Sequence, residues 1–133
     1  MRVAELMTTD LRTISVDATV ADAVDALATT GVSALPVLDR LGRPVGVVST
    51  REVLKAEAFF DTPEAREILF EQTLVLEIMQ AWPPTIHPGA GVTEAAREML
   101  YLETSRLFVE EHGALVGVIS QTDIVGALAT AKL

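Results

Sequence analysis

The sequence predicts a mixed α/β (α+β) fold built from two copies of one β-α-β-β-α unit. Two observations support this prediction. The chain repeats itself at a nearly constant spacing, so that Thr13-Ile14 recurs as Thr85-Ile86. Each copy also alternates the hydrophobic period of a helix with short runs typical of strands. We therefore expect a first repeat over residues 1–58, a helical linker over 59–74 and a second repeat over 75–133.

Each element of the first repeat has its own sequence signal. Residues 13–16 form a short β-prone run, and Thr19 with Asp22 forms a capping signature that opens a helix. Gly31 is expected to end that helix. Residues 35–38 and 44–48 then predict a β-hairpin, and a second helix is expected after Ser49.

The second repeat follows the same order. We expect a strand over 85–88, hairpin strands over 107–110 and 115–119, and a last helix from about Gln121. Its first helix begins at Gly91, which stands where the first repeat has the capping Thr19, so the side-chain cap is lost.

The linker predicts a helix and carries three phenylalanines. Thr62 followed by Pro63 is typical of a helix start, so residues 64–72 are expected to be helical. Phe59, Phe60 and Phe70 either form an exposed surface that docks a partner or pack over the open edges of the two units. We favour packing, because apolar side chains are usually buried.

Composition and charge exclude several classes of function. The chain has 133 residues, 50% of them hydrophobic, and no cysteine, so disulfides, thiolate metal sites and cysteine nucleophiles are excluded. Its net charge of −9 repels polyanions, so no nucleic acid polymer is expected as a partner. No apolar run is long enough to cross a membrane, so we expect no membrane association and a cytoplasmic location.

Each repeat places a Ser-x-x-acid motif where its hairpin leads into its last helix: Ser49 with Glu52, and Ser120 with Asp123. The start of a helix offers free backbone N–H groups and a positive dipole, which suit a phosphate. A carboxylate one turn later can accept both hydrogen bonds of a ribose diol. The same spacing is also that of a capping box, in which the serine and the acid bond to the helix start. Spacing alone leaves both interpretations open.

The order of these motifs, twice, resembles a tandem pair of CBS (cystathionine-β-synthase) domains. The resemblance rests on Thr-Ile before the first helix, on Leu35-Pro36-Val37 on the middle strand, and on the Gly-Val-Val-Ser-x-x-Glu and Gly-Val-Ile-Ser-x-x-Asp segments. It implies one disc-like module, in which the two repeats pack about a pseudo-twofold axis and form two related clefts. Members of the family commonly bind AMP, ADP, ATP or S-adenosylmethionine there, regulate other proteins and form dimers.

The resemblance assigns candidate ligand-binding residues one by one. Asp123 matches the family's ribose-binding acid and Ser120 its hydroxyl residue, whereas the first repeat has Ser49 with the longer Glu52. We therefore rank the second site above the first. Thr13 and Thr85 match positions that touch the base, and Ile86 would supply an apolar wall.

The small number of basic residues near the motifs limits how many phosphates a ligand can carry. Ser33 and Ser105 stand where many relatives have a basic residue, and Arg106 lies one residue further on; Arg51 and Lys55 are other candidates. A ligand with one phosphate or none, such as AMP or S-adenosylmethionine, therefore fits better than ATP.

Three kinds of function remain to be compared. The leading prediction is a regulatory module that binds an adenosine-type ligand, forms a homodimer and signals to an unidentified effector protein. The alternative is a ligand-free dimerisation or scaffold module, which Glu52 and the unusual Phe108 favour. Catalysis is not expected, and no cofactor or metal is expected, because the chain has no nucleophile elbow, no glycine-rich phosphate loop and no metal-ligand spacing.

Overall fold

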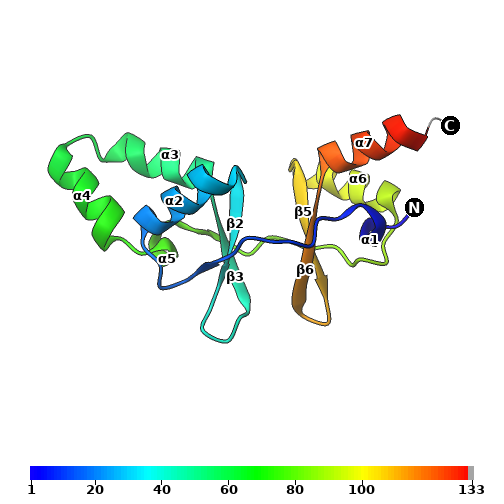
Figure 1. Cartoon of the computed structure of the whole chain (residues 1–133), viewed down its shortest axis with the longest axis horizontal. Helices are drawn as coiled ribbons and strands as arrows, with labels where there is room; N and C mark the ends of the chain where they lie inside the picture. The colour runs from blue at the N-terminus through cyan, green and yellow to red at the C-terminus, as the bar shows by residue number, and fades with distance from the viewer. Residues whose placement is uncertain (132–133) are drawn as a thin grey trace. The chain divides into compact units, whose positions relative to one another are not determined.

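The computed structural model describes residues 1–131, so the last two residues of the expected second repeat lie outside the described part of the chain. The elements follow in the order α1 (Val3–Leu6), β1 (Ile14–Ser15), α2 (Val20–Thr30), β2 (Ala34–Leu38), β3 (Pro44–Ser49), α3 (Thr50–Phe59), α4 (Pro63–Gln72), α5 (Val75–Ile78), β4 (Gln80–Ala81), α6 (Val92–Leu102), β5 (Arg106–Glu111), β6 (Ala114–Ser120) and α7 (Gln121–Ala131) (Figure 1). The mixed fold of two repeats is confirmed.

The chain divides into two compact units. Residues Arg12–Pro83 form the first, here called the central unit, and Met1–Leu11 joins Pro84 and the residues after it in the second, the terminal unit. Each unit therefore combines the body of one repeat with the leading segment of the other.

The central unit holds a four-stranded sheet in the order β1-β2-β3-β4. β1 runs parallel to β2, and the other two pairs are antiparallel. Its core contains six buried residues, contributed by α2, β2, β3 and α5: Ala23, Leu27, Leu35, Val37, Val48 and Val75. Val75 belongs to the leading segment of the second repeat, so that segment helps to build the first repeat's core.

The terminal unit has the same arrangement with shorter outer strands. β5 and β6 form the antiparallel hairpin, Ile86 bridges to Val109 in parallel, and Thr8 bridges to Val118 in antiparallel register. The strand expected over 85–88 is thus wrong, since the structure forms only this one bridge there. Val3 is fully buried in the unit's core, beside residues of α6, β5 and β6.

Two glycines allow the leading segments to approach the hairpins closely. A Cβ on Gly46 would lie 2.5 Å from Met79 Sδ and 2.6 Å from the Gln80 carbonyl oxygen. A Cβ on Gly117 would lie 2.8 Å from Met7 Sδ and 2.9 Å from the Thr8 carbonyl oxygen. In both units a neighbouring backbone therefore occupies the space that a side chain would need.

Local capping signals form the expected contacts. Thr19 Oγ1 accepts from the Asp22 N–H at 3.2 Å, and Asp22 Oδ2 accepts from the Thr19 N–H at 2.9 Å. Gly31 ends α2 with φ 74°, a left-handed conformation that glycine adopts without strain. α6 begins at Gly91 without a side-chain cap, also as expected.

The linker helix forms as expected, but only two of the three linker phenylalanines pack against the core. α4 begins after Thr62, whose side chain accepts from the Ala65 N–H at 3.1 Å. Phe60 and Phe70 pack against the buried cluster of Val20, Ala56 and Leu69. Phe59 is 84% exposed, so the expectation that it packs is wrong. It is the last residue of α3.

Candidate ligand sites

The Ser120–Asp123 motif lies where β6 leads into α7 in the terminal unit. Asp123 Oδ2 accepts from the Ser120 N–H at 2.8 Å, and Ser120 Oγ accepts from the Asp123 N–H at 3.2 Å. The Ser120 hydroxyl is also 2.8 Å from the Thr122 hydroxyl. The motif is therefore a capping box, but the cap occupies only one oxygen of the Asp123 carboxylate.

Strand register brings Arg106 to the same place. Arg106, the first residue of β5, pairs directly with Ser120, the last residue of β6. Directly opposed residues of an antiparallel pair project their side chains from the same face, so Arg106 and Ser120 share one face. Arg106 also takes part in a further interaction within the structure. In the central unit Ala34 occupies the equivalent position opposite Ser49, so that unit has no such cation.

Thr85 and Ile86 lie on the other side of β5. Ile86 is buried in the core and bridges to Val109, three residues along β5 from Arg106. Thr85 Oγ1 lies 3.5 Å from Glu110 Oε2. The structure thus groups Ser120, Asp123 and Arg106 at one end of the hairpin, and it sets Thr85 and Ile86 apart from them along the strand.

In the central unit the Ser49–Glu52 motif is also a capping box. Glu52 Oε1 accepts from the Ser49 N–H at 2.7 Å and from the Ser49 hydroxyl at 2.6 Å, and Ser49 Oγ accepts from the Arg51 N–H at 3.2 Å. Glu52 exposes only 5% of its surface, and its Oε2 is buried without a hydrogen-bond partner. Thr13 is exposed just before β1, at the opposite side of β2 from Ser49.

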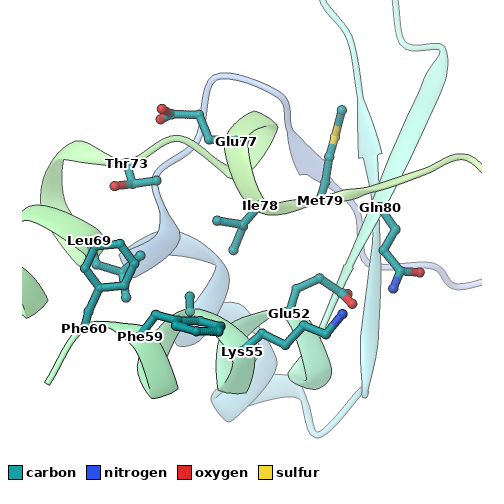
Figure 2. Close-up of a pocket in the computed structure, with 11 residues that line it drawn as sticks. Glu52, Lys55, Phe59, Phe60, Leu69, Thr73, Glu77, Ile78, Met79 and Gln80 are labelled. Atoms are coloured by element: carbon teal, nitrogen blue, oxygen red, sulfur yellow. The ribbon is translucent and has the colours of Figure 1, made fainter.

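A hollow of about 580 Å³ opens beside Glu52 (Figure 2). α3, α4 and α5 line it together with residues just after each of these helices, all of them within the central unit. Its lining residues are Glu52, Lys55, Ala56, Phe59, Phe60, Leu69, Thr73, Glu77, Ile78, Met79 and Gln80. The sequence drew attention to Glu52 and Lys55, but it missed the apolar lining, which comes from segments that no single motif connects.

Neither a metal site nor a membrane span is found in the described part of the chain. No group of three His, Asp or Glu side chains among residues 1–131 could hold a metal ion. Within the same residues, no helix has the length and apolar character needed to cross a bilayer.

Comparison with known proteins identifies the family. The family model described as CBS domain matches residues 3–58 and again 75–130. The chain belongs to the CBS-domain family. A CBS domain-containing protein of Dictyostelium discoideum is 31% identical over 130 residues, which cover 95% of this chain and 90% of that protein. The match to the human 5'-AMP-activated protein kinase subunit gamma-3 is 32% identical and covers 90% of this chain, but only 24% of the subunit.

Solved structures of other CBS proteins have the same fold. The structure titled CBSX2 in complex with AMP matches with a TM-score of 0.82 and 26% identity, over 99% of this chain and 98% of that one. The acetoin utilization protein AcuB of Vibrio cholerae matches with a TM-score of 0.83 and 26% identity, over 99% and 93% of the two chains.

Proposed function

We propose that this CBS-domain protein is a regulatory module that binds an adenosine-type ligand at the Ser120–Asp123 end of the terminal unit. The proposal depends most on one observation: the β5–β6 register sets Arg106 beside Ser120, at the start of a helix whose Asp123 keeps one carboxylate oxygen outside the cap. A guanidinium, a hydroxyl and a helix start suit a phosphate, and a carboxylate oxygen suits a ribose hydroxyl. The similar CBSX2, solved with AMP, supports this class of ligand.

One cation at this end of the hairpin favours a ligand with little charge. Arg106 is the only basic residue among β5, β6 and α7. A chain of two or three phosphates would remain poorly neutralised in a protein of net charge −9. We therefore expect AMP or S-adenosylmethionine to bind more tightly than ADP or ATP, and the terminal unit to bind more tightly than the central one.

In this proposal the module regulates and does not catalyse. Ligand binding shifts the balance between two arrangements of a homodimer in the cytoplasm, and an effector protein reads the change. The ligand can shift that balance only by its difference in affinity for the two states.

A ligand-free dimerisation module is the second candidate, and the exposed helix surface of the terminal unit favours it. Leu100 and Tyr101 on α6 expose 80% and 84% of their surfaces, and Val125 and Leu128 on α7 expose 63% and 65%. Large apolar side chains grouped on a surface are typical of protein contacts.

Thermal unfolding of the full chain against AMP, ADP, ATP, S-adenosylmethionine and GTP separates the two candidates. A ligand at one hundred times its dissociation constant adds about 2.7 kcal/mol to the free energy of unfolding. We expect AMP or S-adenosylmethionine to raise the Tm of the wild type and to leave that of Asp123→Ala unchanged. A dimer whose Tm responds to none of the five compounds would support the scaffold instead.

A further inference from the structure

The hollow in the central unit combines an apolar lining with one cation, Lys55, and two carboxylates, Glu52 and Glu77, of which Glu77 accepts from the Leu74 N–H. Apolar surface comes from the three helices and from the residues just after α3 and α5: Ala56, Phe60, Leu69, Ile78 and Met79. Figure 2 shows Glu52 and Lys55 extending from α3 along the same side of the hollow. A site of this kind suits a small molecule with an apolar body and a few polar groups at one end.

Glu52 has one oxygen that the fold leaves without a partner. Its Oε1 already accepts two hydrogen bonds from Ser49, so the cap is complete without Oε2. Oε2 is buried and has no donor within the described residues. A buried acceptor without a donor costs free energy, so a ligand that brings an N–H group gains more here than at a solvated carboxylate.

Lys55 lies three residues after Glu52 on α3 and supplies the opposite charge. Its side chain is exposed, and within residues 1–131 it forms no ion pair, not even with Glu52. A cation and an anion that remain separate on one helix can bind a ligand that carries both charges.

The second repeat shows that the fold itself does not require these side chains. The positions of Glu52, Lys55 and Phe59 correspond to Asp123, Gly126 and Thr130 in α7. A Cβ on Gly126 would meet no atom within 4 Å, so a larger side chain could be present there and is not. The combination of lysine, aromatic residue and linker helix is specific to the central unit.

We propose that this hollow binds a free α-amino acid with an apolar side chain. The α-ammonium group donates to Glu52 Oε2, the α-carboxylate accepts from Lys55 Nζ, and the side chain packs among Phe60, Leu69 and Ile78. Oε2 has almost no exposed surface of its own, so the proposal requires a neighbouring side chain to change rotamer as the ligand enters. This site goes beyond the proposed function because it takes another class of ligand, which uses Glu52 together with the α3–α4–α5 hollow and not the Ser120–Asp123 end of the terminal unit.

Calorimetric titration of the full chain with L-phenylalanine and L-leucine tests the proposal. Phenylethylamine lacks the carboxylate, 3-phenylpropanoate lacks the ammonium group, and glycine lacks the apolar side chain. We expect saturable binding of one of the two amino acids, weakened at least about tenfold when either charge is absent, and no binding of glycine.

Two substitutions that should not disturb the fold test whether the amino acid binds in this hollow. Glu52→Gln preserves the capping pattern, since glutamine also serves at that position, and Lys55→Met changes an exposed residue. Each variant should lower the affinity for the amino acid at least about tenfold. The matched changes Glu71→Gln and Arg51→Met, outside the hollow, should leave the affinity unchanged. Lys55→Met should also abolish the preference for L-phenylalanine over phenylethylamine.

Three outcomes would overturn the proposal: no saturable binding of either amino acid, equal binding of the analogues, or an affinity that Glu52→Gln leaves unchanged. Binding of the adenosine-type ligand by the terminal unit is measured independently, because it depends on Asp123 and not on Lys55.

Discussion

Asp39 closes the turn between β2 and β3, and its hydrogen bonds there alter its titration. Its carboxylate accepts from the backbone N–H groups of Arg43 and Leu41, each at 2.9 Å, and from Arg43 Nε at 2.9 Å. The bond from the Arg43 backbone is the largest cause that lowers the pKa of Asp39 below its ordinary value of 3.8. These bonds are therefore fully present above that value and are lost as the pH falls through the lower pKa of the folded state.

Carboxyl-carbon NMR of Asp39 checks this expectation directly. The wild-type resonance should titrate below 3.8, and Arg43→Met should move the pKa back towards 3.8 by removing the side-chain bond and the charge. Since the backbone bond from residue 43 remains in the variant, the return should be partial. A wild-type pKa at or above 3.8 would contradict the geometry of the turn.

At the scale of single residues, the sequence predicted the caps better than the site. Spacing alone placed the Thr19–Asp22 and Thr62 caps, because their partners lie within one turn. It could not decide between cap and ligand site for Ser120 and Asp123, and the structure shows that one carboxylate serves the cap with a single oxygen. The exposure of Phe59 also escaped prediction, since nothing local determines which ring at a helix end finds a neighbour.

At the scale of elements, each leading segment pairs with a hairpin strand at a glycine or at the residue next to one, Gly46 in β3 and Val118 beside Gly117 in β6. Gly46→Ala and Gly117→Ala would each force a methyl group onto a backbone carbonyl oxygen that is itself held in the pairing. We expect each variant to lower the free energy of unfolding by roughly 1–3 kcal/mol.

Chemical denaturation measures this effect, and Gly126→Ala is its control. Gly126 lies within α7, where a Cβ would meet no atom within 4 Å. This substitution should therefore stabilise the protein by up to about 1 kcal/mol through helix propensity. Alanine variants at Gly46 and Gly117 that unfold at the wild-type denaturant concentration would show that the leading segments do not pack as described.

At the scale of the whole molecule, the two repeats exchange their leading segments. Val3, from the first repeat, is fully buried in the core of the terminal unit, and Val75, from the second repeat, is fully buried in that of the central unit. Sequence comparison defines the repeats but cannot show this exchange, because similar segments would fit either hairpin. Pairing between distant segments depends on the fold as a whole and leaves no periodic signal in the chain.

Amide hydrogen–deuterium exchange of two matched variants tests whether each leading segment packs in the unit of the other repeat. Val3→Ala and Val75→Ala should each cost about 2 kcal/mol, since each removes two methyl groups from a buried site. Val3→Ala should reduce amide protection mainly in β5 and β6, and Val75→Ala mainly in β2 and β3. The opposite assignment, with Val3→Ala exposing β2 and β3, would mean that each leading segment belongs with its own repeat.

The central functional claim is that the terminal unit binds an adenosine-type ligand through Asp123. Calorimetric titration of AMP and S-adenosylmethionine into the wild type, Asp123→Asn and the surface control Glu71→Gln tests it most directly. The account predicts saturable binding of at least one compound by the wild type and the control, and an affinity at least about tenfold lower in Asp123→Asn. Equal affinity in all three proteins, or no binding heat with either compound, would contradict it.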